Sequence, residues 1–133
     1  MKASSLSLRA AVLFGIVGML MGIAMAATHD HSVRPAHAHL NLLGWVSLFL
    51  IGIYYKLHPS LDLSRAALWQ ALVWILGTVI LTVGVAALYL GYPAAEPVAI
   101  VGSLIIFADM LLFTFLVFRP TAEHGATRLA PAE

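Results

Sequence analysis

The chain of 133 residues contains no cysteine. This absence excludes disulfide bonds, iron–sulfur clusters, thiolate zinc sites and covalent attachment of c-type haem. Any metal site must therefore be built from histidine, carboxylate, methionine or carbonyl ligands.

Charged residues are also scarce, at 10% of the chain, and the formal net charge is only +1. A soluble domain has about 25% charged residues, and a nucleic-acid-binding surface needs an excess of basic ones. Hydrophobic residues make up 62% of the chain, against about 45–50% in a soluble domain. The composition therefore indicates a single-domain integral membrane protein surrounded by lipid, with no nucleic-acid partner.

Long apolar runs dominate the sequence. A helix needs about 20 apolar residues to cross roughly 30 Å of hydrocarbon. We expect four such helices, at about 10–27, 37–55, 66–90 and 97–118, in one transmembrane domain of residues 1–120. The short polar segments between them predict an all-α, antiparallel four-helix transmembrane bundle. Residues 121–133 are polar and are predicted to form a flexible cytoplasmic tail.

The positions of lysine and arginine predict how the bundle is oriented. Lys2 and Arg9 precede the first helix, Lys56 and Arg65 flank the second loop, and Arg119 follows the fourth helix. Because basic residues concentrate on the cytoplasmic side, both termini are expected inside the cell. The chain is thus expected to be a multi-pass protein of a bacterial inner membrane, with the first and third loops outside.

The first helix has an alternative interpretation. Residues 1–27 combine two basic residues, an apolar run and an Ala-x-Ala site at 24–26, which is the pattern of a cleavable secretory signal. Retention is favoured because the run is long for a signal and carries Gly18 and Gly22 in a GxxxG spacing, which lets helices approach closely. Both interpretations place the following histidines outside.

Histidines cluster in the first loop and at the start of the second helix. Four of the six histidines form two His-x-His pairs, which are His29 with His31 and His37 with His39. Imidazole is a ligand for zinc, copper, nickel and haem iron, so two pairs joined by a turn predict a metal or haem site. Asp30 is a candidate ligand or a partner that orients an imidazole. The simpler alternative is that these side chains are only polar groups at the membrane surface.

Helical geometry ranks these candidates. A helix that starts near Pro35 places His37 and Asn41 one turn apart, on the face that also carries glycines, whereas His39 lies about 200° round the helix. We therefore expect His37 to be the essential buried ligand with Asn41 beside it. His39 and one or both histidines of the first pair would complete the site.

Asp109 is the other unusual residue, because it falls inside the fourth apolar run. A central aspartate costs about 2.5–3.5 kcal/mol on insertion scales, so it is expected to face the bundle interior. It is either a proton-handling or polar-network residue, or a protonated acid hydrogen-bonded to a backbone carbonyl or to Thr78, Thr82 or Thr114.

The run from His29 to Trp45, with the sequence HDHSVRPAHAHLNLLGW, resembles short bacterial membrane proteins labelled cytochrome c oxidase subunit I-like, of the haem-copper oxidase superfamily. In the large oxidase subunit a histidine near the outer end of the second helix binds the low-spin haem. The matching residue here is His37, with His39 as the second choice. The resemblance implies haem b or copper as the cofactor, with zinc ranked below them.

This chain lacks the later histidines that hold the second haem and the copper in an oxidase, so it is not a complete terminal oxidase on its own, and no catalytic residue is assigned. The leading hypothesis is a haem- or metal-binding membrane protein in electron transfer or in an accessory respiratory role. Its expected partners are a respiratory complex or periplasmic redox protein and further copies of itself. The alternatives are copper or zinc delivery or sensing without catalysis, and a structural subunit that binds no cofactor.

Overall fold

A computed structural model describes residues 1–119, and the predicted tail at 121–133 lies outside this range. The elements are α1 (Ala3–Thr28), α2 (Arg34–His39), η1 (Leu40–Ser47), α3 (Leu48–Leu57), α4 (Pro59–Asp62), α5 (Arg65–Tyr89), η2 (Pro93–Ala95) and α6 (Glu96–Phe118). α2, η1 and α3 form one continuous span. Counting this span as one helix, the described part of the chain has four helices long and apolar enough to cross a membrane. The predicted all-α, four-helix architecture is confirmed for this part of the chain.

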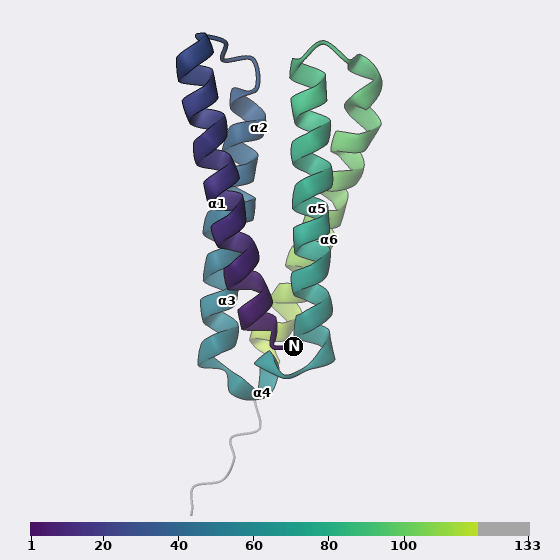
Figure 1. Ribbon diagram of the computed structural model, residues 1–133. Coiled ribbons are helices and arrows are strands. Elements are labelled where there is room, and N and C mark those ends of the chain that lie inside the picture. The colour runs from purple at the N-terminus through teal and green to yellow at the C-terminus, as the bar shows by residue number, and fades with distance from the viewer. Residues whose placement is uncertain (120–133) are drawn as a thin grey trace, which may run out of the picture.

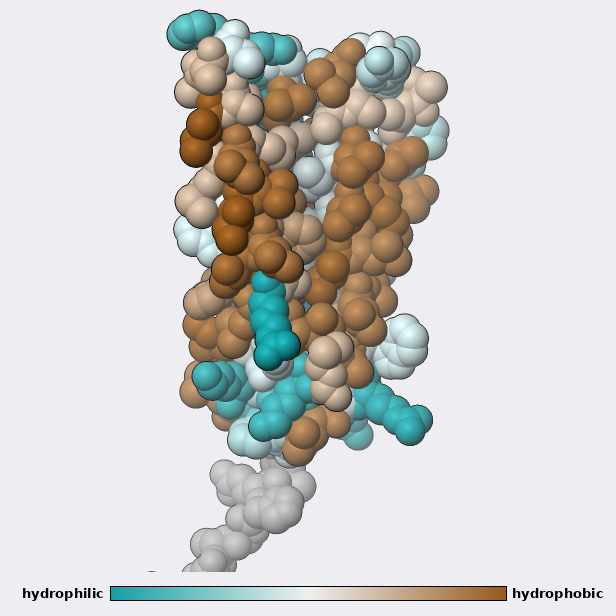
Figure 2. Space-filling view, in the orientation of Figure 1, coloured by the Kyte–Doolittle hydropathy of each residue, from teal (hydrophilic) through white to brown (hydrophobic). Residues whose placement is uncertain are grey.

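The helices form two antiparallel pairs that stand side by side (Figure 1). α1 packs on the span α2–η1–α3, and α5 packs on α6. We call the end that carries the turn 28–34 and the connection 90–95 the histidine end, and the opposite end, which carries α4, the basic end. A broad hydrophobic band lies between hydrophilic side chains at the two ends (Figure 2), as expected for a protein that spans a bilayer.

The α5–α6 pair is held at very short range by two glycines. A Cβ at Gly84 would lie 2.5 Å from the backbone nitrogen of Ala99, and a Cβ at Gly102 would lie 2.5 Å from the backbone nitrogen of Leu81. In lipid, where apolar surface gains little by leaving its surroundings, such close backbone contact is a main source of helix association. α6 contacts the other helices of the bundle through side chains. For example, the ring centroid of Phe113 on α6 lies 5.9 Å from the ring centroid of Tyr55 on α3.

The first helix starts earlier than predicted, at Ala3 instead of residue 10. The cause is Asp62, which is buried at the basic end. One of its carboxylate oxygens accepts from the backbone N–H of Ser4 at 2.7 Å, and the other accepts from the Ser4 hydroxyl at 2.8 Å. A carboxylate at a helix N-terminus satisfies a free N–H and complements the helix dipole, so residues 3–9, which include three serines and an arginine, can remain helical.

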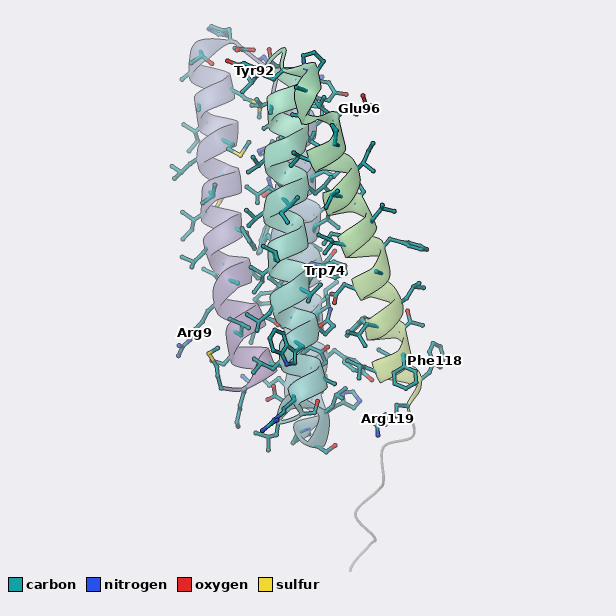
Figure 3. The ribbon with its side chains drawn as sticks, turned by 90° about the vertical axis from the view of Figure 1, so that its right-hand side faces the viewer. Arg9, Trp74, Tyr92, Glu96, Phe118 and Arg119 are labelled. Atoms are coloured by element: carbon teal, nitrogen blue, oxygen red, sulfur yellow. The ribbon has the colours of Figure 1, made fainter. Side chains whose placement is uncertain are left out.

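The second span is not uniformly α-helical, which the sequence did not predict. Residues Leu40–Ser47 form a π-helix, a rare geometry that is often found at functional sites. Within it, the backbone carbonyl of Leu43 accepts a hydrogen bond from the indole N–H of Trp74 on α5, at 3.0 Å. This contact joins the two helix pairs near the middle of the bundle, where Trp74 lies in Figure 3.

Candidate functional site at the histidine end

His29 and His31 lie in the tight turn that ends α1. His29 has the left-handed backbone conformation (φ 56°) that closes the helix, and Nδ1 of His31 lies 3.2 Å from the carbonyl oxygen of His29. Both side chains are exposed. The first histidine pair is therefore ordered by local contacts and does not reach into the bundle.

Asp30 is held by the same turn. Its Oδ1 accepts from the backbone N–H of Ser32 at 2.9 Å and from the Ser32 hydroxyl at 2.5 Å. Both hydrogen bonds lower the pKa of Asp30 below its usual value, and the bond from the Ser32 hydroxyl has the larger effect. The carboxylate thus stabilises the turn, and no hydrogen bond links it to an imidazole in the part of the chain that the structure describes.

His37 and Asn41 stack one turn apart, as the sequence predicts. The Asn41 amide donates to the carbonyl of His37 at 2.8 Å and lies 3.4 Å from the ring Nδ1. This face is covered by α1 at its GxxxG sequence. A Cβ at Gly22 would stand 3.2 Å from His37 Cε1, and one at Gly18 would overlap the Asn41 amide. The predicted glycine-lined face is therefore a packing seam between two helices, with the His37 ring at its outer edge.

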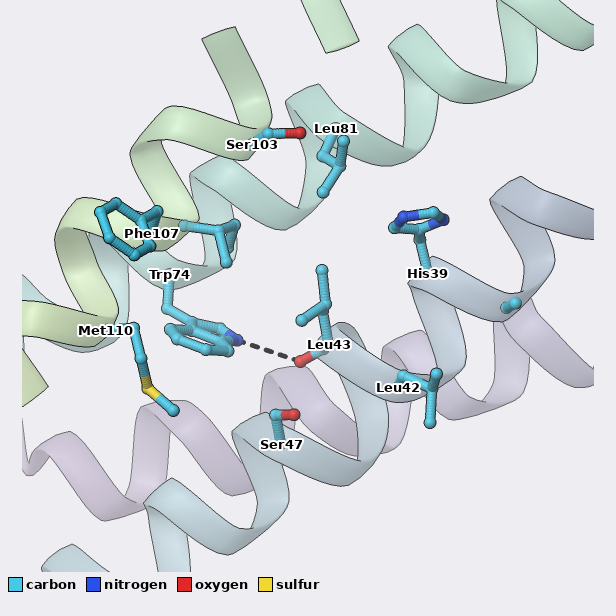
Figure 4. A pocket seen from close by; sticks show the side chains of 11 residues that line it. His39, Leu42, Leu43, Ser47, Trp74, Leu81, Ser103, Phe107 and Met110 are labelled. Atoms are coloured by element: carbon cyan, nitrogen blue, oxygen red, sulfur yellow. Dashed lines mark hydrogen bonds between the residues drawn. The ribbon is translucent and has the colours of Figure 1, made fainter. Parts of the chain in front are cut away.

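His39 points to the opposite side of the same span. It lies at the edge of a cavity of about 520 Å³ between the second span and the α5–α6 pair (Figure 4). Its Nδ1 is 2.7 Å from the carbonyl oxygen of Pro35. A carbonyl only accepts hydrogen bonds, so Nδ1 carries a proton, and in the neutral imidazole the lone pair is then on Nε2. This is the arrangement that orients a histidine for binding through Nε2.

The cavity beside His39 is almost wholly apolar. Its lining includes Leu43, Trp74, Leu81, Phe107 and Met110. Besides the imidazole, the polar side-chain groups are the hydroxyls of Ser47 and Ser103 and the indole N–H of Trp74, which donates to the Leu43 carbonyl. Several lining side chains, Phe107 and Met110 among them, are exposed, so the cavity is a groove open along one side. It continues toward the basic end as a second cavity of about 330 Å³ that shares Ser47, Trp74 and Met110 with the first. We call the two cavities together the groove.

The four predicted histidines do not converge. Residues 1–119 contain no group of three or more histidine, aspartate or glutamate side chains placed to hold one metal ion. His29 and His31 are at the surface, His37 is against α1, and His39 is in the groove. Met110, the thioether that also lines the cavity, lies at the end opposite His39 in Figure 4.

Asp109 faces the bundle interior, as predicted, and is 2% exposed. Its partner is Gln70 of α5 and none of the three threonines considered from the sequence, so that expectation was wrong. The Gln70 amide donates to Asp109 Oδ2 at 2.7 Å, while the Gln70 carbonyl accepts from the hydroxyl of Tyr55 at 2.6 Å. Asp109 Oδ1 has no hydrogen-bond partner among the described residues. A buried chain of three side chains thus connects α3, α5 and α6.

The polar chain and the groove include residues that the sequence did not single out for function. Tyr55 is fully buried, and Trp74 is nearly so. Gln70 had one available signal, since it begins the seven-residue spacing of Gly77 and Gly84 along α5. A polar side chain on a glycine-lined helix face must find a partner on the neighbouring helix.

Comparison with protein-family models, with curated proteins and with solved structures gave no match for this chain. The geometry of the histidine end and of the groove is therefore the basis for inferring a function.

Proposed function

We propose that this protein binds haem b in the groove through His39 and acts in electron transfer or as an accessory factor of a respiratory oxidase. The observation that carries the proposal is the His39 ring, held at Nδ1 by the Pro35 carbonyl with Nε2 free beside an apolar cavity of about 520 Å³. Cavities that take cofactors typically measure about 300–1,000 Å³ and are mostly apolar with few polar groups.

The ligand count favours haem over a bare metal ion. A zinc ion needs about three or four protein ligands, and copper sites likewise draw on several. The groove offers one imidazole, and the described residues hold no three-residue ligand group. Haem supplies its own four nitrogens and can be held by a single proximal histidine, as in globins. The residues present therefore fit haem with His39 as its protein ligand.

The remaining groove residues suit a porphyrin for simple reasons. Trp74, Phe107 and Leu81 offer flat or apolar surface and exclude water, which is the environment that tunes a haem's redox potential. When bound, the haem would supply one-electron chemistry. The protein's own part is to fix the His39 tautomer and to keep the cavity apolar.

The proposed orientation places His39, the proposed haem ligand, in the outer half of the membrane. The basic end holds Lys2, Arg9, Lys56, Arg65 and Arg119, so we propose that it faces the cytoplasm of a bacterial cell and that the histidine end faces the periplasm. Haem at this depth would exchange electrons with quinol in the membrane or with a periplasmic redox protein. Association with a respiratory complex or with further copies of the chain belongs to the same proposal.

The test is the visible absorption spectrum and haem content of protein purified without a histidine tag. Wild-type protein should show a Soret band, and His39→Ala should lose it. His58→Ala is the matched control, because His58 Nδ1 also lies 2.7 Å from a backbone carbonyl, that of Tyr54, but the ring stacks on Tyr54 at the basic end. This variant should keep full haem content, and His37→Ala should keep most of it.

Two results would overturn the proposal. Wild-type protein that carries no haem after expression with haem supplied would exclude the cofactor. Loss of haem in His37→Ala together with retention in His39→Ala would place the ligand on the α1 side of the span. Helix content measured by circular dichroism separates loss of haem from loss of fold in each variant.

A further inference from the structure

A second cavity with a different character lies at the basic end. It is a cleft of about 510 Å³ between the start of α1 and the end of α3. Lys2, Ser5 and Arg9 line it from the α1 side, and Lys56 lines it from α3. Figure 2 shows hydrophilic side chains gathered at this end, just below the hydrophobic band, and Figure 3 shows Arg9 leaving the outside of α1 there.

Within residues 1–119, the side chains that line the cleft carry more positive than negative charge. Its only acid is Asp62, whose two carboxylate oxygens are both engaged by Ser4. Of the other acids within residues 1–119, Asp30 and Glu96 lie at the histidine end, and Asp109 is buried against Gln70. Three exposed cations and one acid, which is already engaged by Ser4, therefore line the cleft among the described residues, and their formal charges sum to +2.

The surface next to the cleft is apolar and runs along the bundle. On α1, Val12 and Ile16 are exposed one and two turns after Leu8. On α3, Ile53 and Phe49 are exposed one and two turns before Lys56. A small free anion would bind through the cations alone and would not use the apolar surface. A cleft of cations that opens onto apolar ridges matches a molecule with an anionic head and hydrocarbon chains.

We propose that this cleft binds the phosphodiester headgroup of one anionic phospholipid, with its acyl chains along the exposed ridges of α1 and α3. Lys2, Arg9 and Lys56 supply the charge, and the Ser5 hydroxyl is a hydrogen-bond donor at the same place. Basic pockets between transmembrane helices are known to recognise such headgroups, and each basic residue near the surface contributes about 1 kcal/mol. The cleft shares no lining residue with the groove, so the inference is independent of the haem site.

The test uses delipidated full-length protein in a zwitterionic detergent, titrated with phosphatidylglycerol or phosphatidylcholine and read by native mass spectrometry. Wild-type protein should bind one phosphatidylglycerol in preference to phosphatidylcholine. Arg9→Gln and Lys56→Gln should each weaken phosphatidylglycerol binding about fivefold and leave phosphatidylcholine binding unchanged. Arg65→Gln is the matched control, because Arg65 is exposed at the same end but does not line the cleft.

Three outcomes would overturn the inference. Equal binding of the two lipids would show that the charge of the cleft selects nothing. An equal loss in Arg65→Gln would mean a diffuse attraction of the whole basic end. Displacement of the lipid by inorganic phosphate at comparable concentration would show that the cleft recognises a free anion and that the acyl chains contribute nothing.

Discussion

Gly102→Ala tests whether the α5–α6 seam is as tight as the structure shows. The added Cβ would lie 2.5 Å from the nitrogen and 2.6 Å from the Cα of Leu81, whereas ordinary contact begins at 3.4 Å. These are backbone atoms of a helix, so no rotamer change can relieve the overlap. α6 must move away from α5 by up to about 1 Å, and since α6 forms one wall of the groove, the groove changes with it.

The expected loss of stability follows from two opposing effects. Overpacking typically costs about 1–3 kcal/mol, and an obstacle that cannot rotate belongs to the upper part of that range. Replacing a helical glycine by alanine returns about 1 kcal/mol of helix propensity. We therefore expect Gly102→Ala to lower the free energy of unfolding by about 1–2 kcal/mol.

The assay is unfolding in mixed micelles with increasing dodecyl sulfate, followed by circular dichroism. Gly22→Ala is the control, because its Cβ would meet only the Cε1 atom of the His37 side chain, at 3.2 Å, and that ring can turn aside. It should be as stable as wild type or up to about 1 kcal/mol more stable. If Gly102→Ala matches wild type while Gly22→Ala is the weaker variant, the close backbone approach of α5 and α6 is refuted.

Two further predictions concern the buried polar chain and the orientation. Asp109→Asn keeps an acceptor for the Gln70 amide and should leave the free energy of unfolding nearly unchanged. Asp109→Leu should lower the free energy of unfolding by about 0.6–1.7 kcal/mol, because Tyr55 already occupies the Gln70 carbonyl and the Gln70 amide cannot turn over to find another partner. The same unfolding assay measures both variants. An Asp109→Asn variant less stable than Asp109→Leu would contradict the hydrogen-bonded chain. Reporter fusions within residues 91–96 should be active in the periplasm and a fusion at Glu133 active in the cytoplasm, and a periplasmic C-terminus would disprove the proposed orientation.

The class of protein could be predicted from sequence because hydropathy is a local property that adds along the chain. Four apolar runs separated by short polar segments predict four antiparallel helices, and the structure contains them. The same reasoning places all four clustered histidines at one end. It also predicts that Asp109 faces inward, since a carboxyl group exposed to lipid costs too much.

Helical periodicity also predicted that His37 and His39 lie on opposite faces, and the structure agrees. It could not say what covers each face. α1 covers the His37 face because Gly18 and Gly22 let it approach, and this leaves His39 over the groove. Which face becomes a packing seam and which lines a cavity depends on which other helix packs against it. The periodicity of a single helix carries no information about its packing partners.

The remaining features were decided by contacts between residues distant in sequence. The early start of α1 depends on Asp62, which is 58 residues from Ser4, and the partner of Asp109 is Gln70, 39 residues away. In each case the sequence shows a polar group that needs a partner. Only the register and separation of the packed helices determine which group comes within hydrogen-bond distance.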